Sequence, residues 1–190
     1  MTALPYSPLM HGARCHECPL YGEGTVVPPS GPLDAPIAFV NDSPSYHDLR
    51  AREQLSGTAG IKFDEMLWGI GYRRNEVWKT SAILCRFQVP GLEGKKRYQL
   101  TSYMAWLRKM NAERKRVDQP PRPSPFECCK PRLDAELKVL EEAAKARGAP
   151  NGVVVQPLGP YALKYVAGAA QGKPASIQKY RGSVIQVPAP

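Results

Sequence analysis

The chain has 190 residues, a net charge of +9 and a pI near 9.4, and this length favours a single domain with its own apolar core. No run reaches the roughly 18 apolar residues that a membrane-spanning helix needs, and the first residues lack the pattern of a signal peptide. We therefore expect a cytoplasmic protein that does not bind membranes, in a reducing compartment where clustered cysteines more often bind metal than form disulfides. The positive charge favours a polyanionic partner, and nucleic acid is the leading candidate.

The first half of the chain predicts two strands and one helix. Residues 37–40 form a short apolar run after a proline, which predicts a buried strand. Four apolar residues recur at helical spacing within 61–70, so we expect a helix there, with Gly71 as its C-cap and Trp68 in the core. Residues 77–84 predict a second strand.

The second half predicts three helices and two strands. Apolar residues at helical spacing mark helices, and short Val-rich runs mark strands. Strands that alternate with helices predict a three-layer α/β/α domain over residues 1–190, with a central, largely parallel four-stranded sheet. In chain order these elements are a helix marked by apolar residues at 100–107, a helix from near Pro131 to Gly148, a strand at 152–156, a helix from Pro160 to Gly168 and a strand at 184–187.

Most of the positive charge lies in one segment, at about 87–124, where nine Lys or Arg residues stand against three acidic residues. Cations follow phosphates and aromatic side chains stack on unpaired bases, so this segment is a candidate arm for single-stranded DNA. The alternative is an ordinary amphipathic helix that buries its aromatic residues. The consecutive cations are Lys95, Lys96 and Arg97, and the interleaved aromatic residues are Tyr98, Tyr103 and Trp106.

Five cysteines are spread along the chain. Cys15 and Cys18 form a CxxC pair, Cys85 ends the strand predicted at 77–84, and Cys128 and Cys129 precede a predicted helix. One pair and two distant single residues supply four thiolates, with one cysteine to spare, and four thiolates suit either zinc or an iron–sulfur cluster. The alternative is that Cys85 and Cys128 are small core residues.

Several short motifs follow one another in the order found in the iron–sulfur, family-four uracil-DNA glycosylases, which the chain resembles across most of its length. The resemblance implies a structural [4Fe–4S] cluster on Cys15, Cys18, Cys85 and Cys129, with zinc as the alternative metal. The motifs are the CxxC-Pro-Leu segment at 15–20, the strand end and loop at 39–45, and the segments at 55–60, 80–86, 127–133, 158–162 and 181–182.

This resemblance also implies an activity, the hydrolysis of the N-glycosidic bond of uracil in DNA after the base has left the stack. Asp42 and Asp48 match the acidic positions of the first active-site loop, where a carboxylate orients water or stabilises positive charge on the sugar. The alternative is that either Asp caps a turn or a helix. The remaining assignments are Ser43, Leu55 and Ser81 for the base pocket, and Gly57, Gly60, Lys95, Lys96, Arg97 and Arg181 for DNA.

Three departures from the family bear on activity. Leu55 replaces the aromatic residue on which uracil stacks, Ser81 replaces the Asn that recognises the base, and no His after His47 supplies the family's His-Pro-Ser-type loop. We therefore expect one of two functions. The chain is a glycosylase that excises uracil or another base, or it is an inactive, cluster-stabilised module that binds nucleic acid or a protein partner in a replication or repair assembly.

Overall fold

The computed structural model describes residues 6–149 and 151–167. Its main sheet is parallel, with the strand order β3–β2–β5. The central strand, β2, is almost entirely buried because both faces of the sheet are covered. The three strands are β2 (Ile37–Asn41), β3 (Trp78–Ser81) and β5 (Val154–Leu158).

The structure confirms the strands predicted at 37–40 and 152–156, the second with a shift of its bounds. The strand predicted at 184–187 lies outside the described residues. The parallel sheet is therefore observed with three strands, and the fourth stays a prediction.

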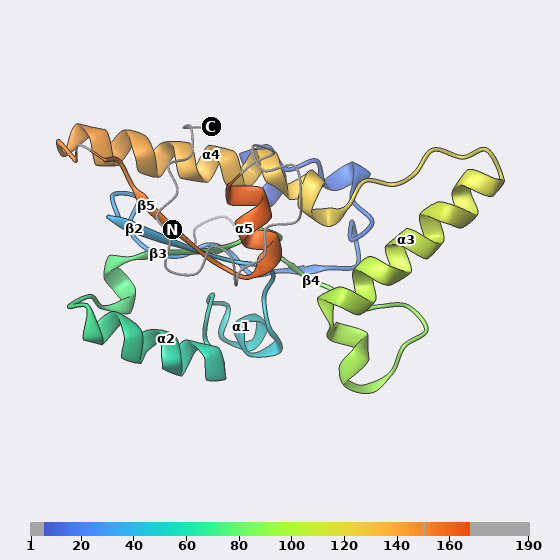
Figure 1. Cartoon of the computed structure of the whole chain (residues 1–190), viewed down its shortest axis with the longest axis horizontal. Coiled ribbons are helices and arrows are strands. Elements are labelled where there is room, and N and C mark those ends of the chain that lie inside the picture. Colours follow the sequence, from blue (N-terminus) through green and yellow to red (C-terminus); the bar gives the residue numbers. More distant parts are fainter. Residues whose placement is uncertain (1–5, 150, 168–190) are drawn as a thin grey trace.

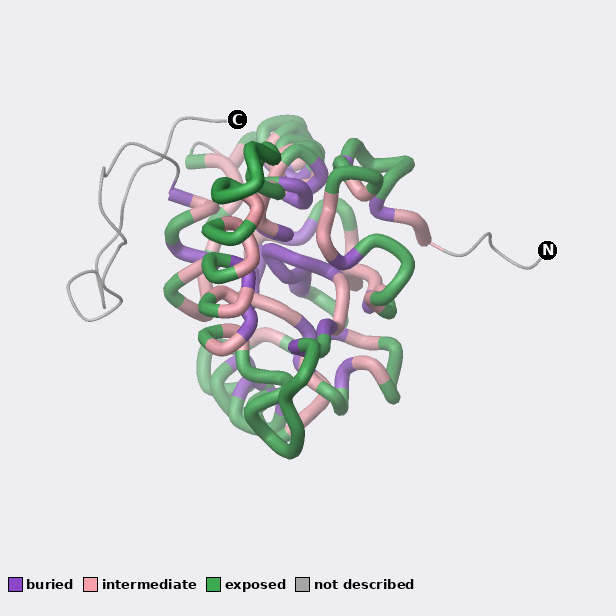
Figure 2. Tube along the Cα trace, turned by 90° about the vertical axis from the view of Figure 1, so that its right-hand side faces the viewer, coloured by how far each residue is buried: buried purple, intermediate pink, exposed green. Residues whose placement is uncertain are grey.

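Helices cover both faces of this sheet (Figure 1). α1 and α2 lie on one face, and α4 lies on the other, in contact with α5. Figure 2 shows buried residues concentrated in the interior, where the strands run between the helices. The arrangement agrees with the predicted α/β class. The helices are α1 (Tyr46–Ala51), α2 (Thr58–Gly69), α4 (Pro125–Ala146) and α5 (Pro160–Val166).

Two apolar clusters fill the space between the sheet and its helices. One packs Val40 of β2 with Leu133 of α4, and the other packs Phe39 against Phe63 of α2, with the two ring centroids 4.8 Å apart. Successive residues of a strand point to opposite faces. Asn41 at the end of β2 therefore faces the α2 side, as Phe39 does.

The buried stripe of α2 differs from the predicted one. Phe63 and Leu67 are buried, but Met66 and Ile70 are exposed, and Trp68 is 72% exposed. The expectation that Trp68 lies in the core is therefore wrong. Successive residues of a helix point about 100° apart, so the position next to the fully buried Leu67 turns away from the sheet.

The strand predicted at 77–84 is shorter in the structure, and a separate strand follows it. β3 ends at Ser81, the chain bends, and β4 (Cys85–Arg86) pairs antiparallel with β1 (Thr25–Val26). The two backbone N–H groups after β3 donate to carbonyls at the end of β2, which stabilises the bend. The bend thus places Cys85 on a separate two-stranded antiparallel sheet.

The basic segment is joined to the core through α3 (Leu100–Arg116). Tyr103 is buried and packs against Phe87, with ring centroids 4.9 Å apart, so the amphipathic alternative is confirmed for this aromatic residue. A short 3-10 helix, η4 (Gly94–Tyr98), precedes α3 and carries three exposed cations. Figure 1 shows η4 in the loop that joins β4 to α3.

The helix predicted to start near Pro131 begins earlier, at Pro125. Ser124 and Glu127 form a capping box, in which Glu127 N donates to Ser124 Oγ at 3.2 Å and Ser124 N donates to Glu127 Oε2 at 2.6 Å. Proline at the first helical position supports the same start. The adjacent Cys-Cys pair consequently lies inside α4 and not before it.

Pro131 lies inside α4 and interrupts the backbone hydrogen bonds of the helix, next to the place where the N-terminal segment contacts it. Because proline has no N–H, the carbonyl of Glu127 loses its helical partner. The Arg14 side chain donates to this carbonyl at 3.3 Å, and the Arg14 N–H donates to the carbonyl of Cys128 at 2.9 Å. These bonds hold the CxxC segment, which contains the short helix η2 (Cys15–Glu17), against α4.

Two further short helices complete the described fold. η1 (Pro8–His11) contacts α4, and η3 (Arg74–Glu76) leads into β3. Within the part of the chain that the structure describes, no helix combines the length and the apolar character needed to cross a membrane.

Candidate functional site

A pocket of about 390 Å³ lies at the carboxyl end of the parallel sheet, on the side of α1 and α2. Ligand sites of open parallel sheets form at this edge, where strands end and loops begin. We call it the strand-end pocket. The residues that line it are Asn41, Asp42, Ser43, Ser45, His47, Asp48, Leu55, Gly57, Thr58, Ala59 and Leu158.

Asp42 lies where β2 meets the start of α5. Its Oδ1 accepts a hydrogen bond from Ala162 N at 2.7 Å, and it packs on Gly159, where a Cβ would collide with the carboxylate. The predicted capping alternative is therefore confirmed for Asp42. Burial raises the pKa of its carboxyl group, against the opposing effect of N–H groups of Ala162 and Tyr161. A pocket carboxylate with a raised pKa is also a suitable proton acceptor.

Asp48 is only 3% exposed and is held by two backbone donors. Oδ2 accepts from Ser45 N at 2.6 Å, as part of the capping box of α1, and Oδ1 accepts from Ser56 N at 2.6 Å. The capping alternative is confirmed here too. Asp48 joins α1 to the loop before α2, so it shapes the wall of the strand-end pocket.

Replacing Asp48 with alanine is expected to lower the free energy of unfolding by about 2 kcal/mol, because two buried N–H donors lose a charged acceptor. Urea denaturation measures this loss. Asp34→Ala is the matched control, since Asp34 is exposed and lies 3.9 Å from Arg147; it should change stability by less than about 0.5 kcal/mol. Equal losses in the two variants would contradict the structural role of Asp48.

Ser81 and Asn41 are register partners on adjacent strands, but only Asn41 lines the strand-end pocket. Ser81 is fully buried and donates to Gln54 Oε1 at 2.6 Å, and Gln54 in turn donates to the carbonyl of Val27 at 2.9 Å. Asn41 is 8% exposed, and its amide has no hydrogen-bond partner among the residues that the structure describes. The free amide of this pocket is therefore at position 41, next to the predicted position 81.

Leu55 lines the pocket in a strained conformation, with φ at 58°. Arg74 holds it in place by donating to the carbonyls of Leu55 at 2.8 Å and Gln54 at 3.1 Å, and Asp64 pairs with Arg74 at 2.9 Å. Gly60 is buried against the Leu55 carbonyl, which leaves no space for a Cβ. Leu55 is thus placed as predicted, whereas Gly60 serves packing.

His47 is a pocket residue that the sequence interpretation missed. Its ring lies 3.0 to 3.2 Å from where a Cβ on Gly57 would be, and it makes an edge contact with Tyr46 at a centroid distance of 5.8 Å. A signal was present, because Ser45 and Asp48 have the spacing of a capping box. That box starts α1 and so directs its first turn, with His47, to the pocket.

The structure brings the cysteines together from three segments. Cys15 lies in η2 and Cys18 follows it, with a hydrogen bond from Cys18 N to Cys15 O at 3.0 Å. Cys85 begins β4 and Cys129 lies in α4. Cys129 is part of the apolar core, and Cys18 and Cys85 pack against the same cluster. All five thiols are free of disulfides.

The thiols lie close enough to affect one another's ionisation. Burial raises the pKa of Cys85 to about 12, and negative charge on Cys129, Cys18 and Cys15 adds to this effect. Cys129 interacts electrostatically with Cys15, Cys18 and Cys85. Cys128 interacts with Cys18 and Cys129. This pattern favours Cys129 over Cys128 as the fourth member of the set.

These sulfur atoms do not form a closed ligand set. Within residues 6–149 and 151–167, no three or more His, Cys, Asp or Glu side chains are arranged to hold a metal ion. Cys18 instead takes a hydrogen bond from Cys128, which lowers the pKa of Cys18. The donors nevertheless fit zinc or an iron–sulfur cluster in type and number. We call Cys15, Cys18, Cys85 and Cys129 the cysteine centre.

Arg132 connects the cysteine centre to the end of β3. It is fully buried, and its Nη2 donates to the carbonyls of Ser81 at 2.7 Å and Ala82 at 3.1 Å, while Nη1 lies 3.0 Å from Glu136 Oε1. Burial raises the pKa of Cys129, and the charge of Arg132 acts against it. A fixed cation therefore favours the thiolate form that a metal requires.

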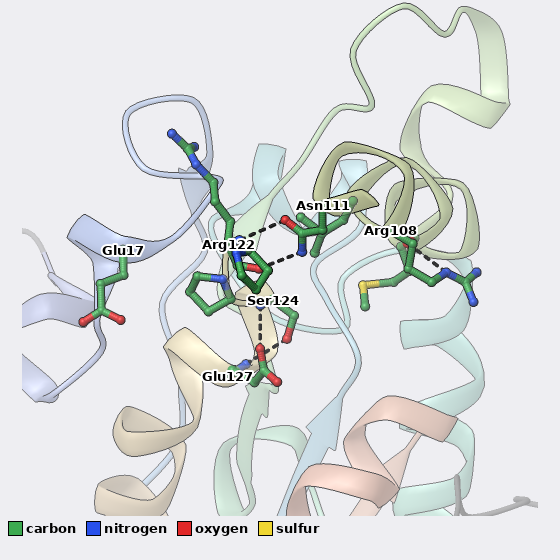
Figure 3. A pocket seen from close by; sticks show the side chains of 10 residues that line it. Glu17, Arg108, Asn111, Arg122, Ser124 and Glu127 are labelled. Carbon is green, nitrogen blue, oxygen red and sulfur yellow. Dashed lines mark hydrogen bonds between the residues drawn. The ribbon is translucent and has the colours of Figure 1, made fainter. Parts of the chain in front are cut away.

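A second hollow, of about 470 Å³, separates α3 from the start of α4 (Figure 3). Several of its polar groups hold the Pro-rich segment in place. Asn111 donates to the carbonyl of Arg122 and accepts from its N–H, both at 2.9 Å, and Ser124 and Glu127 form the cap of α4. These hydrogen bonds fix α3 to the segment that leads into α4.

The residues predicted to bind DNA do not form one continuous group. Lys95, Lys96 and Arg97 are exposed on η4, and none of them pairs with a carboxylate in the described part of the chain. Gly57 lines the strand-end pocket. Arg181 lies outside the described residues.

Two relatives were found by sequence comparison. The type-4 uracil-DNA glycosylase of Thermotoga maritima is 34% identical over 74 residues, which cover 38% of this chain and 38% of the relative. The type-4 uracil-DNA glycosylase of Archaeoglobus fulgidus is 37% identical over 73 residues, which cover 38% of this chain and 37% of the relative. The matched part thus spans less than two fifths of either relative.

No family model matches the chain. The two relatives carry the same name. Over the matched part, the chain is therefore similar to type-4 uracil-DNA glycosylases.

Proposed function

We propose that this protein is an iron–sulfur DNA glycosylase, which binds DNA and hydrolyses the N-glycosidic bond of uracil or of a related base in the strand-end pocket. The observation that carries the proposal is the pocket itself. It combines a carboxylate of raised pKa, an imidazole, and an amide that has no partner within the described residues, at the carboxyl end of a parallel sheet. A base must leave the helical stack to reach such a site.

Each polar group of the pocket has a role in this reaction. The amide of Asn41 offers one donor and one acceptor to the edge of the base. The carboxylate of Asp42 orients a water molecule and stabilises positive charge that develops on the sugar. His47 donates a hydrogen bond to the base as it leaves with negative charge. Leu55 gives the base an apolar contact surface.

The cysteine centre supports the fold in this proposal. Cys15, Cys18, Cys85 and Cys129 would hold the [4Fe–4S] cluster, with zinc as the alternative metal. When bound, it would connect the N-terminal segment, strand β4 of the β1–β4 pair and α4. Arg132 favours the thiolate state of Cys129 and binds the end of β3, so it stabilises the region between the cysteine centre and the pocket.

Asp42→Asn separates the chemical role of Asp42 from its capping role. The amide oxygen can still accept from Ala162 N, and Asn caps helices about as well as Asp, so unfolding free energy should change by less than about 0.5 kcal/mol. Base release should fall by about 10² or more. In the unmodified protein, release should fall as the pH decreases through the raised pKa of Asp42, because the protonated carboxyl no longer accepts a proton.

The measurement is free uracil released from a single-stranded oligonucleotide, separated by chromatography. Asp34→Asn is the control for a lost surface charge and should behave as the unmodified protein. An Asp42→Asn variant with unchanged release would contradict the role of the carboxylate.

A second candidate function is an inactive module that binds nucleic acid or a protein partner of a repair or replication assembly. It is favoured by the engagement of Ser81 with Gln54 and by the capping bond of Asp42, which leave fewer free polar groups in the pocket. DNA binding without any base release from the unmodified protein would select this candidate.

A further inference from the structure

Tyr98 is an exposed aromatic residue held next to the strand-end pocket. It is 38% exposed, and the guanidinium carbon of Arg86 lies 4.5 Å from the centroid of its ring. Such a contact orients the ring by a cation–π interaction. Part of the aromatic ring remains open to a ligand.

Arg86 connects Tyr98 to the rim of the pocket. Its Nη1 donates to the carbonyl of Pro44 at 3.4 Å, and the residues on either side, Ser43 and Ser45, both line the pocket. One guanidinium thus contacts the pocket loop and the tyrosine ring together. The distance between the pocket and Tyr98 is consequently set by the span of a single arginine side chain.

The η4 segment that carries Tyr98 is anchored at its carboxyl end. Directly before Tyr98, the carbonyl of Arg97 accepts a hydrogen bond from Val89 N at 2.8 Å. After it, α3 begins at Leu100 and is fixed to the core by the buried ring of Tyr103. Tyr98 therefore belongs to an ordered joint, and its position relative to the pocket is defined by contacts on both sides.

The same segment carries uncompensated positive charge. Lys95, Lys96 and Arg97 precede Tyr98 directly and are exposed, and no carboxylate within the described ranges pairs with them. A row of cations beside an exposed aromatic ring is the arrangement that binds a single strand, because cations hold phosphates and the ring stacks on a base.

We infer that Tyr98 is a stacking platform for the unpaired base that neighbours the base in the strand-end pocket, while Lys95, Lys96 and Arg97 hold the adjacent phosphates. This inference rests on the proposed function and adds its preferred substrate form, an unpaired stretch of DNA. It predicts that the protein binds single strands with little sequence preference outside the pocket.

The test measures fluorescence-anisotropy binding of three protein variants to a single-stranded oligonucleotide and to the matching duplex. Tyr98→Ala should weaken single-strand binding by roughly tenfold and duplex binding by less than about twofold, and Tyr98→Phe should bind as the unmodified protein. Trp68→Ala is the matched control, because Trp68 is also exposed beside an arginine, Arg73 at 5.8 Å, but lies at the far end of α2.

A second readout places 2-aminopurine next to the uracil, where stacking on a tyrosine quenches its fluorescence. Quenching should be lost in Tyr98→Ala and kept in Trp68→Ala. Equal effects of Tyr98→Ala on single strands and duplex, or unchanged quenching, would overturn the inference. Base release is scored separately, so release with no Tyr98 effect rejects the inference alone, and a Tyr98 effect without release rejects only the catalytic part of the proposed function.

Discussion

Cys129→Ser is expected to lose most of its iron and to unfold at a temperature about 10 °C or more below the unmodified protein. Metal binding by such a centre contributes directly to folding free energy, and each kcal/mol shifts the unfolding temperature by about 2–4 °C in a chain of this size. Cys129, like Cys18, interacts electrostatically with each of the other three members of the cysteine centre.

Cys128→Ser is the control that the chain itself provides. Cys128 is the neighbour of Cys129 on α4, is also buried, and interacts with Cys18 and Cys129. It should keep its iron and most of its stability. Iron content and unfolding temperature of both variants, purified without oxygen, decide the assignment. Loss of iron from Cys128→Ser with retention in Cys129→Ser would exchange the two roles.

Arg132→Met is expected to lower the free energy of unfolding by about 3–5 kcal/mol. The substitution keeps an apolar side chain of similar length but leaves Glu136, with a side chain only 8% exposed, without its cation. Removing one partner of a buried ion pair is costly because the remaining charge stays desolvated. The carbonyls of Ser81 and Ala82 lose their donors as well.

Urea denaturation of the metal-loaded protein measures this effect. Lys130→Gln is the control on the same helix, since its pair with Asp134 is partly exposed and should contribute less than about 1 kcal/mol. The double variant Arg132→Met, Glu136→Leu should recover part of the loss, because it removes the unpaired charge. A loss in Arg132→Met as small as that of Lys130→Gln would contradict the buried-network account.

Much of the sheet could be predicted from the sequence because its strands are short apolar runs next to turn residues. Residues 37–40 illustrate this, since burial on both faces leaves no polar position. The early end of the strand predicted at 77–84 could not be predicted, because the bend after Ser81 has no Gly or Pro. It is stabilised by hydrogen bonds to the end of β2, a segment far away in the sequence.

The start of α4 could have been predicted from the sequence, since Ser124 and Glu127 have capping-box spacing. The apolar pattern instead predicts a start near Pro131, and proline usually does not lie inside a helix. Here it does, because Arg14 from the N-terminal segment supplies a donor to the carbonyl that proline leaves free. Only the tertiary contact explains this exception.

The candidate site was predicted in part. Motif order identified the loops of Asp42, Asp48 and Leu55, and all three line the pocket. The family resemblance alone predicts Ser81 as a pocket residue, but Ser81 is buried, donates a hydrogen bond to Gln54 and does not line the pocket. The role of Asn41 could not be predicted, because the structure is needed to show that its amide lines the strand-end pocket.

The most direct test of the account is the iron and acid-labile sulfide content of the unmodified protein, purified without oxygen. The account predicts a brown protein with about four iron and four sulfide per chain, as a [4Fe–4S] cluster on four cysteines requires. A colourless protein that is fully folded without iron, sulfide or zinc would contradict the claim that the cysteine centre holds this fold together.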